Sequence, residues 1–411
     1  MAPNTFEEVL TRMLSAFRAC WSSILPQQGW VGGVSGLTDQ GAMLAGAQAA
    51  AFQPSHESVK HIEEQSAPLF DGTLEEFAHA RGNSHPTLTV QLRNVVRRCM
   101  HCGKANGFTM TACNGCNAPF PKGQQTTHTP NVFMGFIYGV ARTDAFPLII
   151  SIRRQTRESL VFDDPLALTP CHLNVIPTES WVADWRMLLR NPKEGLHLIT
   201  RLEKEAWECV ATQFLSCDIW CKKMLRCGRP TDPEQLRPYI ISGCNFPPSQ
   251  FQLHIQYFLM PWLPCQYRPF LDGNQMVEGR WFPLEYIKRV LALDDPMAVT
   301  IDTPLSEIFA KYDGRVPYRA SVKAAYAQVN AGHGKLANWQ PADFTLAIMS
   351  GKVTGDSDGR SSLEVIADDK KTMQSTAPQT SKTYYKYART EPVPEWGKVE
   401  LARLLRSATG L

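Results

Sequence analysis

The stretch Ser249-Gln-Phe-Gln-Leu-His-Ile-Gln-Tyr-Phe-Leu-Met-Pro261 alternates polar and apolar side chains over most of its length. As a strand, it would place Gln252, His254 and Gln256 on one face and apolar side chains on the other. Each buried polar group needs a hydrogen-bond partner, so three polar residues in a row on one face are unusual in a core. The pattern predicts a strand whose polar face handles a polar ligand. The alternative is a half-exposed sheet face with an incidental histidine.

A second stretch, Val161-Phe-Asp-Asp-Pro-Leu-Ala-Leu-Thr-Pro-Cys-His-Leu-Asn-Val-Ile-Pro177, favours the ligand-binding interpretation. Phe162 and Asp164 lie at the end of one apolar run, and His172 opens another that closes on Val-Ile-Pro. Taken singly, Asp164 fits a turn cap and His172 fits a satisfied core histidine. Their occurrence together, ahead of the Gln-x-His-x-Gln stretch, outweighs both of these interpretations.

Together the two stretches resemble the histidine-triad (HIT) superfamily. Members of that family carry Phe-x-Asp at a strand end, then His-φ-x-Val-Ile-Pro, and later His-φ-His-φ-His or His-φ-His-φ-Gln. The resemblance covers roughly residues 131–290 and implies an α+β fold with an antiparallel sheet, in which the strands of His172 and His254 are neighbours. The chain departs from the family at the first histidine of the later motif, where it has Gln252.

The resemblance also implies a nucleotide or nucleotide-sugar substrate. His254 corresponds to the nucleophile that forms a nucleotidyl-histidine intermediate, and His172 and Gln256 would assist it. The residues that would contact the substrate are Ser249, at an α-phosphate oxygen, Gln252, Asp164, at the ribose hydroxyls, and Phe162, at the base.

Two functions stay open on this resemblance. A glutamine at position 256 favours a nucleotidyltransferase or phosphorylase over a hydrolase, since family members that end the motif in histidine are usually hydrolases. The replacement of the first motif histidine by Gln252 favours instead an inactive HIT scaffold. Many HIT proteins form homodimers, and a homodimer is one expectation here.

Four cysteines, Cys99, Cys102, Cys113 and Cys116, form two Cys-x2-Cys pairs. Such pairs supply four thiolates to one tetrahedral Zn²⁺, so we expect a structural zinc site. The spacing Cys-x2-Cys-x3-Asn-x6-Cys-x2-Cys resembles the Ran-binding-protein type of zinc finger, some members of which bind single-stranded RNA and others ubiquitin. The tryptophan that usually precedes the first cysteine is absent. The finger is therefore either an RNA- or protein-binding module or a staple that fastens the N-terminal region to the core.

Composition sets wider limits. The chain has 411 residues, 44% of them hydrophobic, and a net charge of +3, which by itself gives no argument for a nucleic-acid partner. No apolar run approaches the roughly 20 residues that span a membrane, and the N-terminus lacks the pattern of a secretory signal. We expect an intracellular, cytoplasmic protein in a reducing compartment, with no membrane partner.

The expected organisation has five parts: an N-terminal extension, partly helical, at 1–95; the four-cysteine zinc finger at 96–122; a HIT-like domain at 131–300; a helical extension at 301–350; and a largely disordered tail at 351–411. Within the HIT-like domain, residues 131–140 are expected to form a strand. A long helix near 196–210, with apolar residues at three- and four-residue steps, is expected to cover the sheet.

Overall fold

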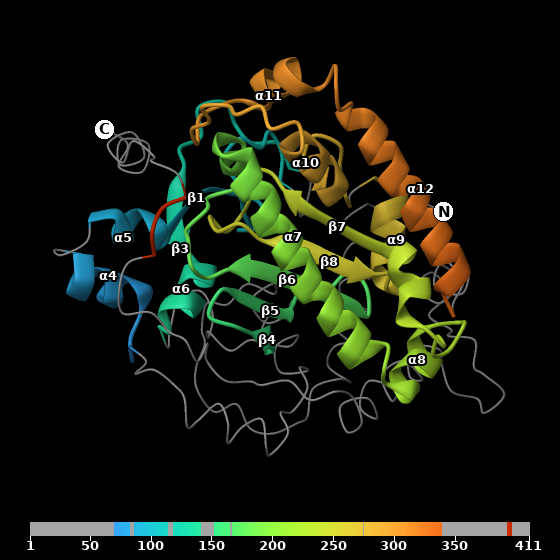
Figure 1. Ribbon diagram of the computed structural model, residues 1–411. Helices are drawn as coiled ribbons and strands as arrows, with labels where there is room; N and C mark the ends of the chain where they lie inside the picture. Colours follow the sequence, from blue (N-terminus) through green and yellow to red (C-terminus); the bar gives the residue numbers. More distant parts are fainter. Residues whose placement is uncertain are drawn as a thin grey trace, which may run out of the picture.

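The computed structural model describes residues 70–82, 86–113, 118–140, 152–164, 167–273, 275–338 and 393–396. These residues form an α+β structure with two antiparallel sheets. Figure 1 shows the larger sheet at the centre, with helices packed around it and the smaller sheet at one end. The α+β fold class expected from the sequence is confirmed.

The smaller sheet belongs to the cysteine-rich region. Two short helices, α4 (Leu74–Gly82) and α5 (Pro86–Gln91), precede it. Its strands are β1 (Arg93–Arg98), β2 (Ala105–Gly107) and β3 (Thr127–Pro130), in the order β2-β1-β3. The β1–β2 hairpin encloses the first cysteine pair, and β3 returns the chain to the core.

The larger sheet has six strands in the order β4-β5-β6-β8-β7-β9, and all its pairs are antiparallel. Its strands are β4 (Ile152–Gln155), β5 (Ser159–Asp163), β6 (Cys171–Pro177), β7 (Ile240–Asn245), β8 (Ile255–Leu259) and β9 (Trp281–Pro283). The first three form a meander. The chain then crosses one face of the sheet, and β8 returns to pair with β6.

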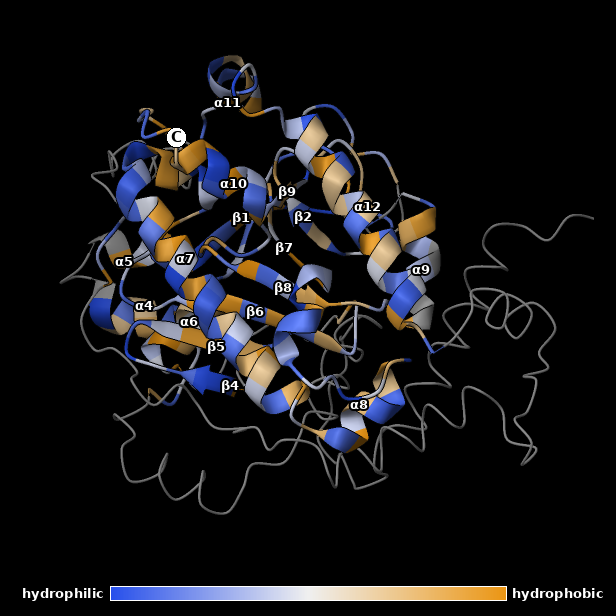
Figure 2. Cartoon of the chain, turned by 45° about the vertical axis from the view of Figure 1, so that its right-hand side comes forward, coloured by the Kyte–Doolittle hydropathy of each residue, from blue (hydrophilic) through white to orange (hydrophobic). Residues whose placement is uncertain are grey.

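Helix α7 (Pro192–Cys209) makes that crossing and covers β5, β6 and β8, as expected from the sequence. Pro192 stands at its first turn, where the missing N–H costs nothing. Leu198, Ile199 and Leu202 are buried against the sheet, and Figure 2 shows hydrophilic residues interleaved with them along the helix. A 3₁₀ helix (Trp185–Arg190) precedes α7, and a π turn (Val210–Phe214) follows it.

The remaining helices enclose the other edges. They are α8 (Asp218–Met224), the 3₁₀ helix Pro233–Tyr239, α9 (Pro264–Leu271), α10 (Leu284–Leu291), α11 (Leu305–Tyr312) and α12 (Tyr318–Leu336). Aromatic side chains join them: Trp262 stacks on Phe270 of α9 with ring centroids 5.0 Å apart. Among the described residues, none of these helices combines the length and the apolar character needed to cross a bilayer.

The expected strand at 131–140 is wrong, because this segment is the helix α6 (Val132–Tyr138). The side chain of Asn131 caps its first turn by accepting from the Met134 N–H at 3.3 Å. Gly139 ends it with φ 66°, a left-handed conformation that suits glycine. These two caps stop the apolar run after two turns.

The expected strand at 249–261 is also too long at its start. The structure has β8 begin at Ile255, and residues 249–254 form bends and irregular backbone. Of the expected disordered tail, the structure describes 393–396, and Val393 is 1% exposed. The rest of the expected tail and residues 1–69 lie outside the described residues.

Candidate functional site

The register of β6 against β8 brings the two predicted motifs together. Asn174 lies opposite Gln256, and His172 lies opposite Phe258. Tyr257 is close to the carboxylate of Glu203 on α7, so the alternate residues point away from that helix. His172, Asn174 and Gln256 therefore share the sheet face opposite α7. The adjacency of the two strands, predicted from the sequence, is confirmed.

His254 lies just before β8 and is held by its own backbone neighbourhood. Its Nδ1 is 2.8 Å from the carbonyl oxygen of Gln252. A carbonyl only accepts, so Nδ1 carries the ring proton and Nε2 keeps the lone pair. Burial lowers the pKa of His254, while the Gln252 carbonyl and the charge of Asp164 act to raise it. The ring is thus neutral near pH 7, with Nε2 as its nucleophilic atom.

Gln252 is not presented to a ligand. Its side chain is fully buried and makes three hydrogen bonds, all to backbone. Nε2 donates to the carbonyls of Pro177 (2.7 Å) and Ser180 (3.0 Å), and Oε1 accepts from the Val182 N–H at 3.0 Å. The expectation that Gln252 contacts substrate is therefore replaced by a structural role, in which it fixes the loop after β6 beside His254.

A buried polar cluster lies at the other end of this face. Asn174 Nδ2 donates to Asp164 Oδ2 at 2.8 Å, and His172 Nε2 lies 3.7 Å from the same oxygen. His172 Nδ1 accepts from the Leu168 N–H at 3.0 Å, so the neutral ring carries its proton on Nε2. That Nε2 and Asn174 Oδ1 are buried without a hydrogen-bond partner among the described residues. A hydroxyl group, which both donates and accepts, matches this pair.

Burial lowers the pKa of His172, and the charges of Asp164 and Asp163 act to raise it. The imidazole is therefore neutral at neutral pH. Its fixed Nε2–H gives it the role of a donor rather than a base.

The other predicted substrate residues are placed differently. Phe162 is 1% exposed and lies under the rings of Phe133 and Phe136 of α6, with centroids 5.4 and 5.7 Å away. The Gln256 side chain is half-buried, with no hydrogen bond to the described residues. Ser249 is exposed, on the irregular segment ahead of β8. The structure thus gathers Asp164, His172 and Gln256 on one face and leaves Ser249 at the surface.

Three of the four predicted metal ligands lie together. The sulfur atoms of Cys99, Cys102 and Cys113 are all within 4.8 Å of one another, close enough to hold one metal ion. Cys102 Sγ and Cys113 Sγ are 3.6 Å apart, against about 3.8 Å between thiolates on a tetrahedral zinc with bonds of about 2.3 Å. Cys116 lies outside the described residues.

Backbone hydrogen bonds shape each half of this metal site. The Gly103 N–H donates to Cys99 O at 2.8 Å, and the Cys99 N–H donates to Lys104 O at 2.9 Å. In the second half, the Cys113 N–H donates to Ala118 O at 2.9 Å. The first two bonds turn the chain back on itself at the first cysteine pair, and the third pairs Cys113 with Ala118.

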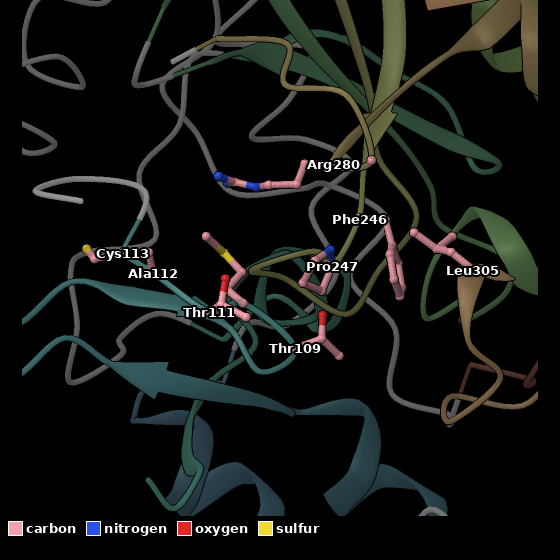
Figure 3. Close-up of a pocket in the computed structure, with 10 residues that line it drawn as sticks. Thr109, Thr111, Ala112, Cys113, Phe246, Pro247, Arg280 and Leu305 are labelled. Atoms are coloured by element: carbon pink, nitrogen blue, oxygen red, sulfur yellow. The ribbon is translucent and has the colours of Figure 1, made fainter. Parts of the chain in front are cut away.

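A cavity of about 280 Å³ separates this metal site from the large sheet. Figure 3 shows Thr109, Thr111 and Cys113 on one side and Phe246, Pro247 and Leu305 on the other, with the Arg280 side chain reaching across the top. Burial lowers the pKa of the Arg280 guanidinium, and the nearby Cys113 thiol group acts to raise it. Arg280 is thus a positive charge near Cys113 that lines this cavity.

No family model, no curated protein and no solved structure matches this chain. Sequence reasoning missed Asn174, although it stands two residues after His172, at the same alternate position that singled out Gln256. It also missed Phe133, whose ring lies 5.2 Å from that of His254, because the segment was expected to be a strand. Phe133 packs against the predicted nucleophile, and Asn174 lies opposite Gln256, two residues after it.

Proposed function

We propose that this chain is a nucleotide-binding protein of the HIT type that reacts through a nucleotidyl-histidine on His254. The observation that supports it most is the 2.8 Å contact between His254 Nδ1 and the Gln252 carbonyl, which leaves Nε2 as a neutral nucleophile. The pairing of β8 with the His172 strand is a second support. Because the Gln252 side chain has a structural role, the lost motif histidine removes no reacting group.

In the proposed reaction, His254 Nε2 attacks the α-phosphorus of a nucleotide or nucleotide sugar. A nitrogen–phosphorus bond forms, and the bond to the leaving phosphate or sugar phosphate breaks, with its electron pair staying on the leaving oxygen. An acceptor then displaces the histidine: inorganic phosphate or a sugar phosphate in a transferase or phosphorylase, water in a hydrolase. Gln256, half-buried opposite Asn174, would donate to the phosphate oxygens as charge develops.

Substrate contacts follow from the same face. Asp164 and His172 would hold ribose hydroxyls, and Ser249 would close on a phosphate oxygen. Phe133, whose ring covers the buried Phe162, would face the base. We further propose that the metal is a structural Zn²⁺ with Cys116 as its fourth ligand, supported by the sulfur–sulfur separation. As a closed four-thiolate site, it would organise the finger and take no part in the reaction.

A second candidate function is an inactive scaffold whose finger binds RNA. Exposed Arg93, Arg98 and Lys122 on the small sheet and the turn ahead of β3 favour it, since they are free to contact phosphates. If the chain is such a scaffold, its RNA binding should weaken steeply with added salt. The scaffold would form no nucleotidyl adduct on histidine.

The test is incubation with a panel of dinucleotides and nucleotide sugars, with and without phosphate, followed by mass spectrometry of the intact protein. We expect an acid-labile increase in mass equal to one nucleotidyl group, located on His254. His254→Ala should abolish the adduct while nucleotide binding persists. The matched control is His197→Ala, at an exposed histidine of α7 on the opposite face, which should react as the wild type does. Absence of an adduct with every substrate would favour the scaffold.

A further inference from the structure

A segment far along the chain packs against the core of this structure and buries its first residue, Val393. Residues 393–396, here called the strap, lie beside Trp181 and form an isolated parallel bridge with it through Glu395. The Trp181 N–H donates to Pro394 O, and the Trp396 N–H donates to Trp181 O, both at 2.8 Å. The strap thus pairs with both the N–H and the carbonyl of Trp181. A peptide that adds to the exposed edge of a sheet makes the same kind of backbone pairing.

The strap is also held by polar side chains from the N-terminal helices. Val393 is 1% exposed, its N–H donates to Tyr138 Oη at 2.8 Å, and its carbonyl accepts from Gln91 Nε2 at 2.7 Å. Tyr138 Oη in turn donates to Gln91 Oε1 at 2.8 Å. Removing the strap would take away the acceptor of the buried Gln91 Nε2, which is costly in a core.

From Trp181 a continuous set of hydrogen bonds leads to the proposed nucleophile. The indole of Trp181 donates to Phe251 O. The next residue, Val182, is paired twice: its N–H donates to Gln252 Oε1, and its carbonyl accepts from the Leu253 N–H. The carbonyl of Gln252 then holds Nδ1 of His254. The loop that the strap fixes is therefore the loop that sets the histidine.

A second branch ends at the same place. Asn131 Nδ2 donates to Gln91 O at 2.9 Å and to Phe251 O at 3.1 Å. Gln91, the partner of Val393, is thus tied to the backbone just before Gln252. Both branches converge on residues 251–252, and both donate to the carbonyl oxygen of Phe251.

We propose that the strap is an intramolecular positioning element that holds His254 in its reactive orientation. The occupant of this slot is the chain's own Val-Pro-Glu-Trp segment, anchored by the buried Val393 and paired with Trp181 as described above. The catalytic part of this inference rests on the proposed function, in which His254 is the nucleophile. The geometric part, that the strap sets the His254 ring, can be measured without activity.

The experiment compares two shortened chains, one ending at residue 392 and one at residue 396. The first readout is the ¹⁵N spectrum of the His254 ring, which reports the proton on Nδ1. The second is the rate of nucleotidyl-adduct formation. We expect the chain ending at 396 to behave as the full chain does. The chain ending at 392 should lose the fixed Nδ1–H signal and form adduct more slowly, on the order of tenfold or more. A synthetic peptide spanning residues 389–400, added in trans, should restore both.

A gentler variant covers the case in which the shorter chain does not fold. Tyr138→Phe in the full chain removes the acceptor of the Val393 N–H. The matched control is Tyr326→Phe on α12, whose hydroxyl donates to Met276 O and does not contact the strap. Only the first should alter the His254 ring signal. An unchanged signal in both the 392 chain and Tyr138→Phe would overturn the proposal. If no protein forms an adduct, the proposed function fails, while the ring signal still decides the role of the strap.

Discussion

At the scale of single residues, the side chain and the backbone carbonyl of Gln252 have different roles. The chain departs there from the HIT pattern, which by itself suggests lost activity. In the structure the side chain fixes a loop and the carbonyl orients His254. If His254 is the nucleophile proposed above, the glutamine at position 252 keeps the carbonyl that orients it.

Gln252→His, which introduces the histidine found at this place in the HIT pattern, should destabilise this protein. Glutamine makes one accepted and two donated hydrogen bonds here, and the two nitrogens of an imidazole cannot reproduce all three. We expect the free energy of unfolding to fall by about 1–3 kcal/mol, the range for a buried polar group left without its partner. Urea unfolding measures this. Gln235→His, at an exposed glutamine, is the control and should change it by less than about 0.5 kcal/mol. A stabilising effect of Gln252→His would contradict the structural role.

At the scale of elements, the metal finger gives the clearest prediction. Cys113→Ser should abolish tight zinc binding and lower the thermal midpoint, because the finger has a single short sheet and depends on its metal. Metal analysis of the purified wild type should give about one zinc per chain. Cys227→Ser, at an exposed cysteine away from the finger, should leave zinc content and midpoint unchanged. Equal zinc in the wild type and Cys113→Ser would rule out the site.

Elements could be predicted wherever the sequence has one clear pattern, either a helical repeat of apolar residues or a fixed spacing of cysteines. The apolar stripe of α7 and the paired cysteines are such cases, and the structure places both as expected for the residues it describes. Residues 131–140 could not be assigned this way, because Gly135 and Gly139 interrupt an apolar run that fits either period. The deciding signals were the caps, an asparagine before the run and a glycine after it.

The site was predictable to the level of the face but not of the contacts. Alternation located Gln256 correctly beside the His172 strand, while His254 lies just before the paired residues. It could not show that Gln252 turns to the backbone at 177–182, since those partners lie some seventy residues earlier in the chain. The strap was missed for a related reason: Val393 lies in a polar, low-complexity context, and its burial depends on tertiary partners alone.

At the scale of the whole molecule, buried neutral histidines make its stability depend on pH. Burial lowers the pKa of His333 to about 4, with the charge of Arg226 acting in the same direction. The unfolded chain binds this proton below about pH 6.5 and the folded chain only near pH 4. The contribution of His333 is thus fully present above about pH 6.5 and is lost as the pH falls toward about 4.

His333→Gln should therefore flatten the acid limb of the stability profile. A glutamine keeps an acceptor for the Trp262 N–H, which His333 Nδ1 accepts at 3.2 Å, and it does not titrate. Urea unfolding of both proteins at about pH 7.5 and about pH 5, on either side of the ordinary histidine pKa, measures the difference. Zinc loss in acid affects the two equally, because their cysteines are the same. Parallel declines in the two proteins would show that His333 contributes nothing to the pH dependence.

The place of the strap along the chain has a consequence for how the protein is made. A ribosome completes every strand of the large sheet, and His254 with it, before it reaches residues 393–396. Until that segment emerges, Trp181 lacks the partner for both its backbone groups. If the strap orients the histidine as proposed, a nascent chain carries an assembled sheet with an unset nucleophile. Reactivity then switches on only after residues 393–396 have emerged, well after the strand that follows His254 has been made.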